Sequence, residues 1–212
     1  MKKIRNRATL LTVAALLGVL SAPAHAQQKT MERLHFGSPE AAATFDIERA
    51  KIANSDCSCF WLRGGSGEVA VRFYPAWSLV GSFAGSHASN VQPGTDVGRL
   101  TWLIGPRFRV DGSRFTGPIA SGHGSHLFGQ FLAGGTHGFD GVFPTRSGVA
   151  PSANSYALEA GGGLEISQAR GFNLRAFEID YVRTALPNSA TNTQNDLRLA
   201  FGLAYSFKAP TR

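Results

Sequence analysis

Strict alternation of apolar and polar side chains is the feature that most constrains this chain. Its sharpest example runs from Leu197 to Phe207, where the odd-numbered positions are all apolar and the even-numbered positions after Arg198 are all small. A period of two is the repeat of a β-strand, whose successive side chains point to opposite faces. The segment therefore predicts a strand with an apolar environment on one side and a polar, crowded one on the other.

Seven further segments alternate in the same way, and no segment shows a convincing amphipathic helix. The eight predicted strands span residues 41–49, 68–74, 77–86, 98–110, 127–136, 156–167, 172–184 and 197–207. Most are close to the roughly 9–11 residues with which a tilted strand crosses a bilayer. No run of 18 apolar residues exists, which excludes a membrane-spanning helix. We therefore expect an all-β fold, a closed antiparallel eight-stranded transmembrane barrel with up-and-down strand order.

The connections between these strands alternate in length. Short turns are expected at 75–76 and 168–171. Long connections rich in Gly, Ser, Asn, Pro and Thr are expected at 50–66, 87–96, 138–155 and 185–195. Long links at one end and short turns at the other are typical of outer-membrane barrels. The link at 111–126 is an exception, because it is long where a short turn is expected.

Alternation alone does not decide which face is inside. A soluble periplasmic ligand-binding barrel of the lipocalin type turns its apolar rows inward, whereas a membrane barrel turns them outward. The polar rows favour the membrane barrel, because their basic members are all Arg, which suits confined ion pairs with carboxylates. Small residues also crowd these rows, as a narrow lumen requires. The predicted luminal charge network comprises Asp46, Glu48, Glu68, Arg72, Arg99, Arg107, Arg109, Glu159, Glu165, Glu178, Asp180, Asp196 and Arg198.

Aromatic residues lie toward the ends of the apolar rows, where they are expected to form girdles at the two membrane interfaces. These residues are Trp77, Phe108, Tyr156, Tyr181, Tyr205 and Phe207. Arg175 and Arg183 break the alternation of their strand. We expect both to lie near strand ends, where long side chains can extend toward polar surroundings.

Residues 1–26 have the pattern of a secretory signal peptide. Four basic residues precede an apolar stretch from Leu10 to Leu20, and Ala24-His25-Ala26 predicts cleavage after Ala26. Removing this segment lowers the formal net charge from +7 to +3, and the remaining basic residues form no cluster. A nucleic-acid partner is therefore not expected. The expected organisation is a short segment at 27–37, the barrel at 38–207 and a tail at 208–212.

The C-terminal strand resembles the assembly signal of outer-membrane barrels through Gly202, Tyr205 and Phe207. Together with the stretches 103–107, 161–165 and 174–181, it makes the chain similar to the small OmpA/OmpX-type eight-stranded outer-membrane barrels. The resemblance implies a location in a bacterial outer membrane. It also implies contact with outer-membrane lipid and lipopolysaccharide, and handling by the barrel-assembly machinery and periplasmic chaperones. It brings no catalytic residues.

Few residues suggest chemistry, and we expect no catalytic, cofactor or metal site. His123-Gly124-Ser125 resembles the motif of lipid A deacylases, but it lies in a Gly-rich connection. His123 and His126, in the same connection, are a weak candidate pair of metal ligands. The glycines at 161–163 lie within a predicted strand and lack the residues of a phosphate loop. The close spacing of Cys57 and Cys59 disfavours an unstrained disulfide, and whether the pair is oxidised or free does not follow from the sequence.

The expected function is structural or surface-interactive: membrane integrity, adhesion or recognition through the long loops, around a lumen closed by Arg–carboxylate pairs. Three alternatives remain open at this point. They are the soluble ligand-binding barrel, a small membrane-barrel enzyme acting on lipid A, and a narrow ion-conducting pore. The oligomeric state and the partner of the loops do not follow from the sequence.

Overall fold

The structure is a computed structural model that describes residues 37–51, 59–92, 95–112, 124–188 and 191–207. The predicted signal peptide, nearly all of the 27–37 segment and the 208–212 tail lie outside the described residues, as do Cys57 and His123.

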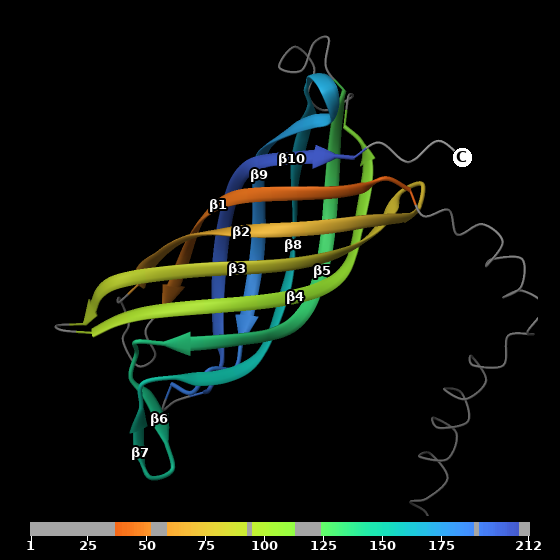
Figure 1. Ribbon diagram of the computed structural model, residues 1–212. Helices are drawn as coiled ribbons and strands as arrows, with labels where there is room; N and C mark the ends of the chain where they lie inside the picture. The colour runs from red at the N-terminus through yellow and green to blue at the C-terminus, as the bar shows by residue number, and fades with distance from the viewer. Residues whose placement is uncertain (1–36, 52–58, 93–94, 113–123, 189–190, 208–212) are drawn as a thin grey trace, which may run out of the picture. The chain divides into compact units, whose positions relative to one another are not determined.

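Eight antiparallel strands form a closed barrel, which confirms the predicted fold class (Figure 1). Each strand pairs with its neighbour along the chain, and the first strand closes the barrel by pairing with the last. The barrel strands are β1 (Pro39–Lys51), β2 (Cys59–Tyr74), β3 (Trp77–Gln92), β4 (Thr95–Asp111), β5 (Ser125–Phe139), β8 (Ala153–Ser167), β9 (Phe172–Thr184) and β10 (Gln194–Ser206). The described residues contain one 3-10 turn, Ala169–Gly171, and no helix among them is long and apolar enough to cross a membrane.

The two ends of the barrel differ. At the end we call the turn end, β2–β3 and β8–β9 are joined by tight connections, β1 begins and β10 ends. The opposite end, the loop end, carries the hairpin formed by β6 (Phe143–Thr145) and β7 (Gly148–Ala150), which extends beyond the barrel strands (Figure 1). This hairpin lies within the long connection expected at 138–155.

Two connections expected to be long are mostly strand. β2 begins at Cys59, inside the expected 50–66 link, and β3 and β4 continue into the expected 87–96 link. The sequence prediction was wrong here because backbone pairing does not need large side chains. The glycines permit close strand contact instead, since a Cβ atom on Gly64 would collide with the carbonyl oxygen of Gly85.

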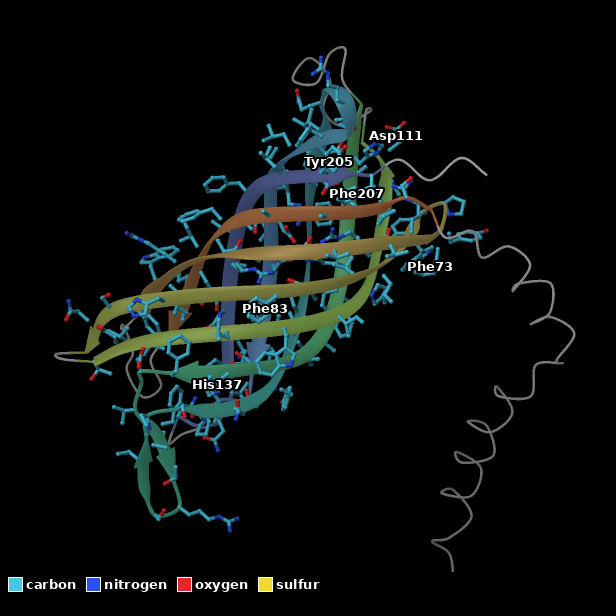
Figure 2. All side chains as sticks on the ribbon, viewed as in Figure 1. Phe73, Phe83, Asp111, His137, Tyr205 and Phe207 are labelled. Carbon is cyan, nitrogen blue, oxygen red and sulfur yellow. The ribbon has the colours of Figure 1, made fainter. Side chains whose placement is uncertain are left out.

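The apolar rows cover the outside of the barrel. Phe83, Ile104 and Leu203, from three different strands, are each more than half exposed, and Phe83 lies on the outer surface in Figure 2. The opposite rows are buried in the lumen and are mostly polar or small. Five buried apolar residues add a compact layer inside the wall formed by β2, β3, β4, β5 and β8: Ala70, Val80, Leu103, Leu132 and Ala157.

A β-bulge in β9 changes which residues of that strand face the lumen. Along β10, Ala200 is opposite Glu178 and Gly202 is opposite Arg175, so three steps on β9 match two on β10. The register of β8 against β9 shifts at the same place. The extra residue brings Arg175 and Glu178 to the same face despite their odd spacing. Arg175 is therefore fully buried in the lumen. The interpretation that it breaks an apolar row and extends along the strand end toward polar surroundings was wrong.

Candidate functional site

The lumen contains the densest group of ionisable side chains that the structure describes. Twelve of the thirteen residues predicted for the luminal network project into it. The thirteenth, Arg72, has the inward parity of β2 but lies exposed at the turn end, and the ion pairs seen among the described residues do not include it. Its position explains this result, because Arg72 stands where the register of β2 with β3 shifts and the strand ends.

Three arginines organise the half of the lumen nearer the turn end. Arg175 is fully buried and contacts Glu68 at 2.7 Å, Glu165 at 3.0 Å and Glu178 at 2.8 Å. Arg107 also binds Glu68, at 2.6 Å. Arg109 bridges Glu165, at 2.6 Å, to Glu40, at 2.8 Å. We call this group the turn-end network: Arg107, Arg109, Arg175, Glu40, Glu68, Glu165 and Glu178.

An aromatic ring lies within the turn-end network. The guanidinium carbons of Arg107 and Arg175 lie 4.6 Å and 5.0 Å from the centroid of the Phe128 ring. Gly163 makes room for this ring, because a Cβ atom there would approach Phe128 Cζ to 2.9 Å. The ring gives both cations a favourable π face in a site that is shielded from solvent.

Two arginines organise the half nearer the loop end. Arg99 donates from its two terminal nitrogens to Glu48 and, at 3.0 Å, to Asp196. Arg198 lies 2.7 Å from Glu159 and 3.0 Å from Asp180. Asp46 is buried nearby and accepts a hydrogen bond of 2.6 Å from Thr44 Oγ1. The loop-end network comprises Arg99, Arg198, Asp46, Glu48, Glu159, Asp180 and Asp196.

Gln130 joins the two networks. Its side-chain oxygen accepts a hydrogen bond from Arg107 Nε at 2.9 Å. Its amide nitrogen donates to Glu178 at 2.7 Å, Glu159 at 3.1 Å and, more weakly, Asp180 at 3.3 Å. A neutral amide suits this place because one end accepts from a cation and the other donates to carboxylates.

The alternation of the sequence did not reveal two members of the turn-end network. Arg175 was missed because the bulge reverses the alternation within β9. Arg175 has the same parity as the outward-facing residues beyond the bulge, yet it faces the lumen. Glu40 was missed because β1 begins before the predicted strand, at Pro39. One signal could have indicated Arg175. The neighbouring strands β8 and β9 carry an excess of buried carboxylates, and buried carboxylates need cationic partners.

The trio Glu159, Glu178 and Asp180 brings three carboxylate oxygens within 4.8 Å of one another. Each of these side chains already contacts an arginine, and all three accept from Gln130. The described geometry is thus that of an ion-paired plug. Near the loop-end network, Arg99, Arg198, Asp46 and Glu48 help line a void of only about 10 Å³, roughly the space that one water molecule needs.

The other candidate residues are dispersed. Ser125 is fully buried, His126 is half-buried beside the turn-end network, and Cys59 is an exposed free thiol. In the assembly-signal segment, Tyr205 contacts Phe172 with ring centroids 4.8 Å apart and Phe207 at 4.9 Å, and all three lie at the turn end. Figure 2 shows Tyr205 and Phe207 close together.

Comparison with known proteins identifies the fold of this chain through similar solved structures. No family model and no curated protein sequence matches the chain. Among solved structures, the attachment invasion locus protein Ail of Yersinia pestis matches with 18% identity, covering 82% of this chain and 100% of Ail, at a TM-score of 0.52. Neisserial surface protein A matches with 12% identity, covering 80% and 97%, at a TM-score of 0.52.

The fold is that of the small eight-stranded outer-membrane barrels. The resemblance to the OmpA/OmpX type stated from the sequence is thereby confirmed at the level of architecture. At these identities the likeness extends to the fold and does not transfer a binding partner.

Proposed function

We propose that this protein spans a bacterial outer membrane and has a structural or surface-interaction role there. The observation that carries the proposal is the inverted distribution of side chains: an apolar outer wall around a lumen filled with ion pairs. A soluble ligand-binding barrel has the opposite arrangement, with an apolar interior and a polar exterior. An apolar wall of this extent is favourable only when lipid covers it.

The ends of the outer wall match the two interfaces of a bilayer. Trp77 and Phe108 pack at 5.0 Å between ring centroids at the turn end, and Tyr156 and Tyr181 are exposed on the outer wall toward the loop end. Such aromatic girdles are typical of membrane barrels. They support a membrane-spanning zone between the two levels.

Three exposed arginines stand on the outward rows near the loop end: Arg49 on β1, Arg63 on β2 and Arg183 on β9. Guanidinium groups bind phosphate through paired hydrogen bonds. Lipopolysaccharide carries phosphates at the outer surface of that membrane. The placement of the arginines therefore supports lipopolysaccharide as the lipid around the loop end. It also supports an orientation with the loop end outside and the turn end in the periplasm.

The turn-end aromatic contact gives a physical basis for the assembly signal. Tyr205 in the last strand and Phe207 directly after it project on the lipid side, and the backbone N–H of Phe207 donates to the carbonyl of Pro39 at 2.9 Å. We propose that the barrel-assembly machinery and periplasmic chaperones recognise this end before it pairs with β1. The name of the Ail protein, which refers to attachment, is compatible with a surface role for the opposite end.

Membrane fractionation tests the proposal. We expect the protein in the outer-membrane fraction, with gel mobility that changes on heating, because a closed barrel resists detergent until it is heated. Recovery in the soluble periplasmic fraction without detergent would overturn the proposal. Planar-bilayer recordings test the pore alternative, and we expect no stable conductance steps because the networks close the lumen.

A further inference from the structure

A cavity of about 580 Å³ opens at the loop end of the barrel, and neither the fold nor the proposed membrane role requires it. This volume lies within the range of about 300–1,000 Å³ that is typical of sites for small organic ligands. Its walls come from the loop-end parts of several barrel strands, from the β6–β7 hairpin and from the segment after β9.

The walls are predominantly apolar. Phe60 and Leu62 of β2 and Val97 of β4 line one part, and Phe143 and Leu186 line another. The hairpin region adds Val142 and Val149, residues that are 59% and 70% exposed. Exposed valines beside an apolar hollow are unfavourable in water, and a bound apolar molecule would shield both.

The floor of the cavity has an unbalanced charge. Arg99 and Asp196 line the cavity, and the two terminal nitrogens of Arg99 already donate hydrogen bonds to Asp196 and Glu48. The three groups together carry one positive and two negative formal charges. An anionic ligand would therefore meet net repulsion and find the arginine occupied.

We propose that this cavity binds an uncharged, apolar small molecule that enters from the loop side. The apolar walls supply the binding energy, and the ion-paired floor excludes anions and prevents passage into the lumen. Phospholipids and lipopolysaccharide are disfavoured as occupants, because their charged head groups do not suit the floor.

Two fluorescent probes with the same ring skeleton test the proposal. N-phenyl-1-naphthylamine is uncharged, and 8-anilino-1-naphthalenesulfonate adds a sulfonate. Each is titrated against the purified barrel in lipid nanodiscs, with empty nanodiscs as the background. We expect saturable binding of the uncharged probe and at least about tenfold weaker binding of the sulfonate. Equal affinities, or no saturable signal above empty nanodiscs, would overturn the proposal.

A pair of variants locates the binding. Val97→Trp fills the cavity, whereas Ser89→Trp adds the same bulk at an exposed position of β3 outside the cavity lining. We expect binding of the uncharged probe to weaken about tenfold or more in Val97→Trp and to stay unchanged in Ser89→Trp. Unchanged binding in Val97→Trp would show that the probe sits elsewhere and would refute the proposal.

A second pair serves if Val97→Trp does not fold, which its gel mobility reports. Val149→Asp places a charge at the rim, and Ser147→Asp places the same charge on the hairpin outside the lining. Both positions are exposed, so neither change disturbs a core. We expect weaker binding only in Val149→Asp. Equal binding by the two variants would contradict the proposed site.

Discussion

The two halves of the lumen are built from the same residue types but differ in charge balance. The turn-end network holds three arginines and four carboxylates, whereas the loop-end network holds two arginines and five carboxylates. Two turn-end arginines, Arg107 and Arg175, also contact Phe128, while the loop-end half contains the small void. Both halves contain buried side-chain atoms without a hydrogen-bond partner among the described residues: Arg107 Nη1 and Arg109 Nε in the turn-end half, and Glu48 Oε1, Arg99 Nε and Asp196 Oδ1 in the loop-end half.

From this difference in charge balance we expect the turn-end half to contribute more to stability, and the larger surplus of carboxylates in the loop-end half to be electrostatically unfavourable. Removing one partner of a satisfied buried pair leaves an uncompensated charge, which costs more than the pair itself contributes. In the loop-end network, where carboxylates outnumber arginines most, removing one carboxylate reduces the repulsion among the remaining ones instead. The variants below test this comparison in order of expected effect.

Arg175→Met should have the largest effect, a loss of about 3–5 kcal/mol in the free energy of unfolding. The substitution leaves Glu68, Glu165 and Glu178 buried without their shared cation. Urea unfolding in lipid vesicles, followed by tryptophan fluorescence, measures it. Arg72→Met is the matched control, because Arg72 is exposed at the rim. Similar losses in both variants would contradict the network.

Gln130→Glu should destabilise by about 1–3 kcal/mol, because it replaces the amide donor that faces Glu159, Glu178 and Asp180 with a fourth carboxyl group. Gln130→Met removes the hydrogen bonds without adding charge and separates the two causes. We expect the Glu variant to be less stable than the Met variant in the same unfolding experiment. The reverse order would show that the surplus of carboxylates is unimportant.

Glu165→Gln and Glu159→Gln should change the free energy of unfolding in different directions. Glu165 is bound by Arg109 and Arg175, so its neutralisation should cost about 1–2 kcal/mol. Glu159 shares Arg198 with Asp180 in the half with the larger excess of negative charge, so its neutralisation should leave stability unchanged or raise it. Parallel urea titrations compare them, and equal destabilisation would remove the distinction between the halves.

Phe128→Leu should cause the smallest of the expected losses, about 1 kcal/mol, because it keeps most of the apolar volume and removes the π face under Arg107 and Arg175. Phe83→Leu on the outer wall is the control for the loss of an aromatic ring. A loss no larger than that of the control would show that the ring only fills space.

The sequence revealed the faces of the strands because a period of two is a local property. Asp46, Glu48, Asp196 and Arg198 lie in uninterrupted strands, and each projects into the lumen as its parity predicts. Arg175 could not be placed in this way, since one inserted residue reverses the parity and no local pattern marks it. The extent of β3 and β4 depends on pairing between them, which a Gly- and Ser-rich sequence does not display. The cavity was equally invisible, because its walls come from distant segments.

The ion pairs across the lumen also bear on how the barrel assembles. Glu68 and Arg175 are 107 residues apart in sequence, and Arg99 and Asp196 are 97 apart. Contacts over such separations form late, after the intervening chain has been ordered. A barrel that lacks its last strands leaves most of these charges without partners inside a forming wall. Completion of the wall and pairing of the charges inside it are therefore one cooperative event, and partly closed intermediates should be sparsely populated.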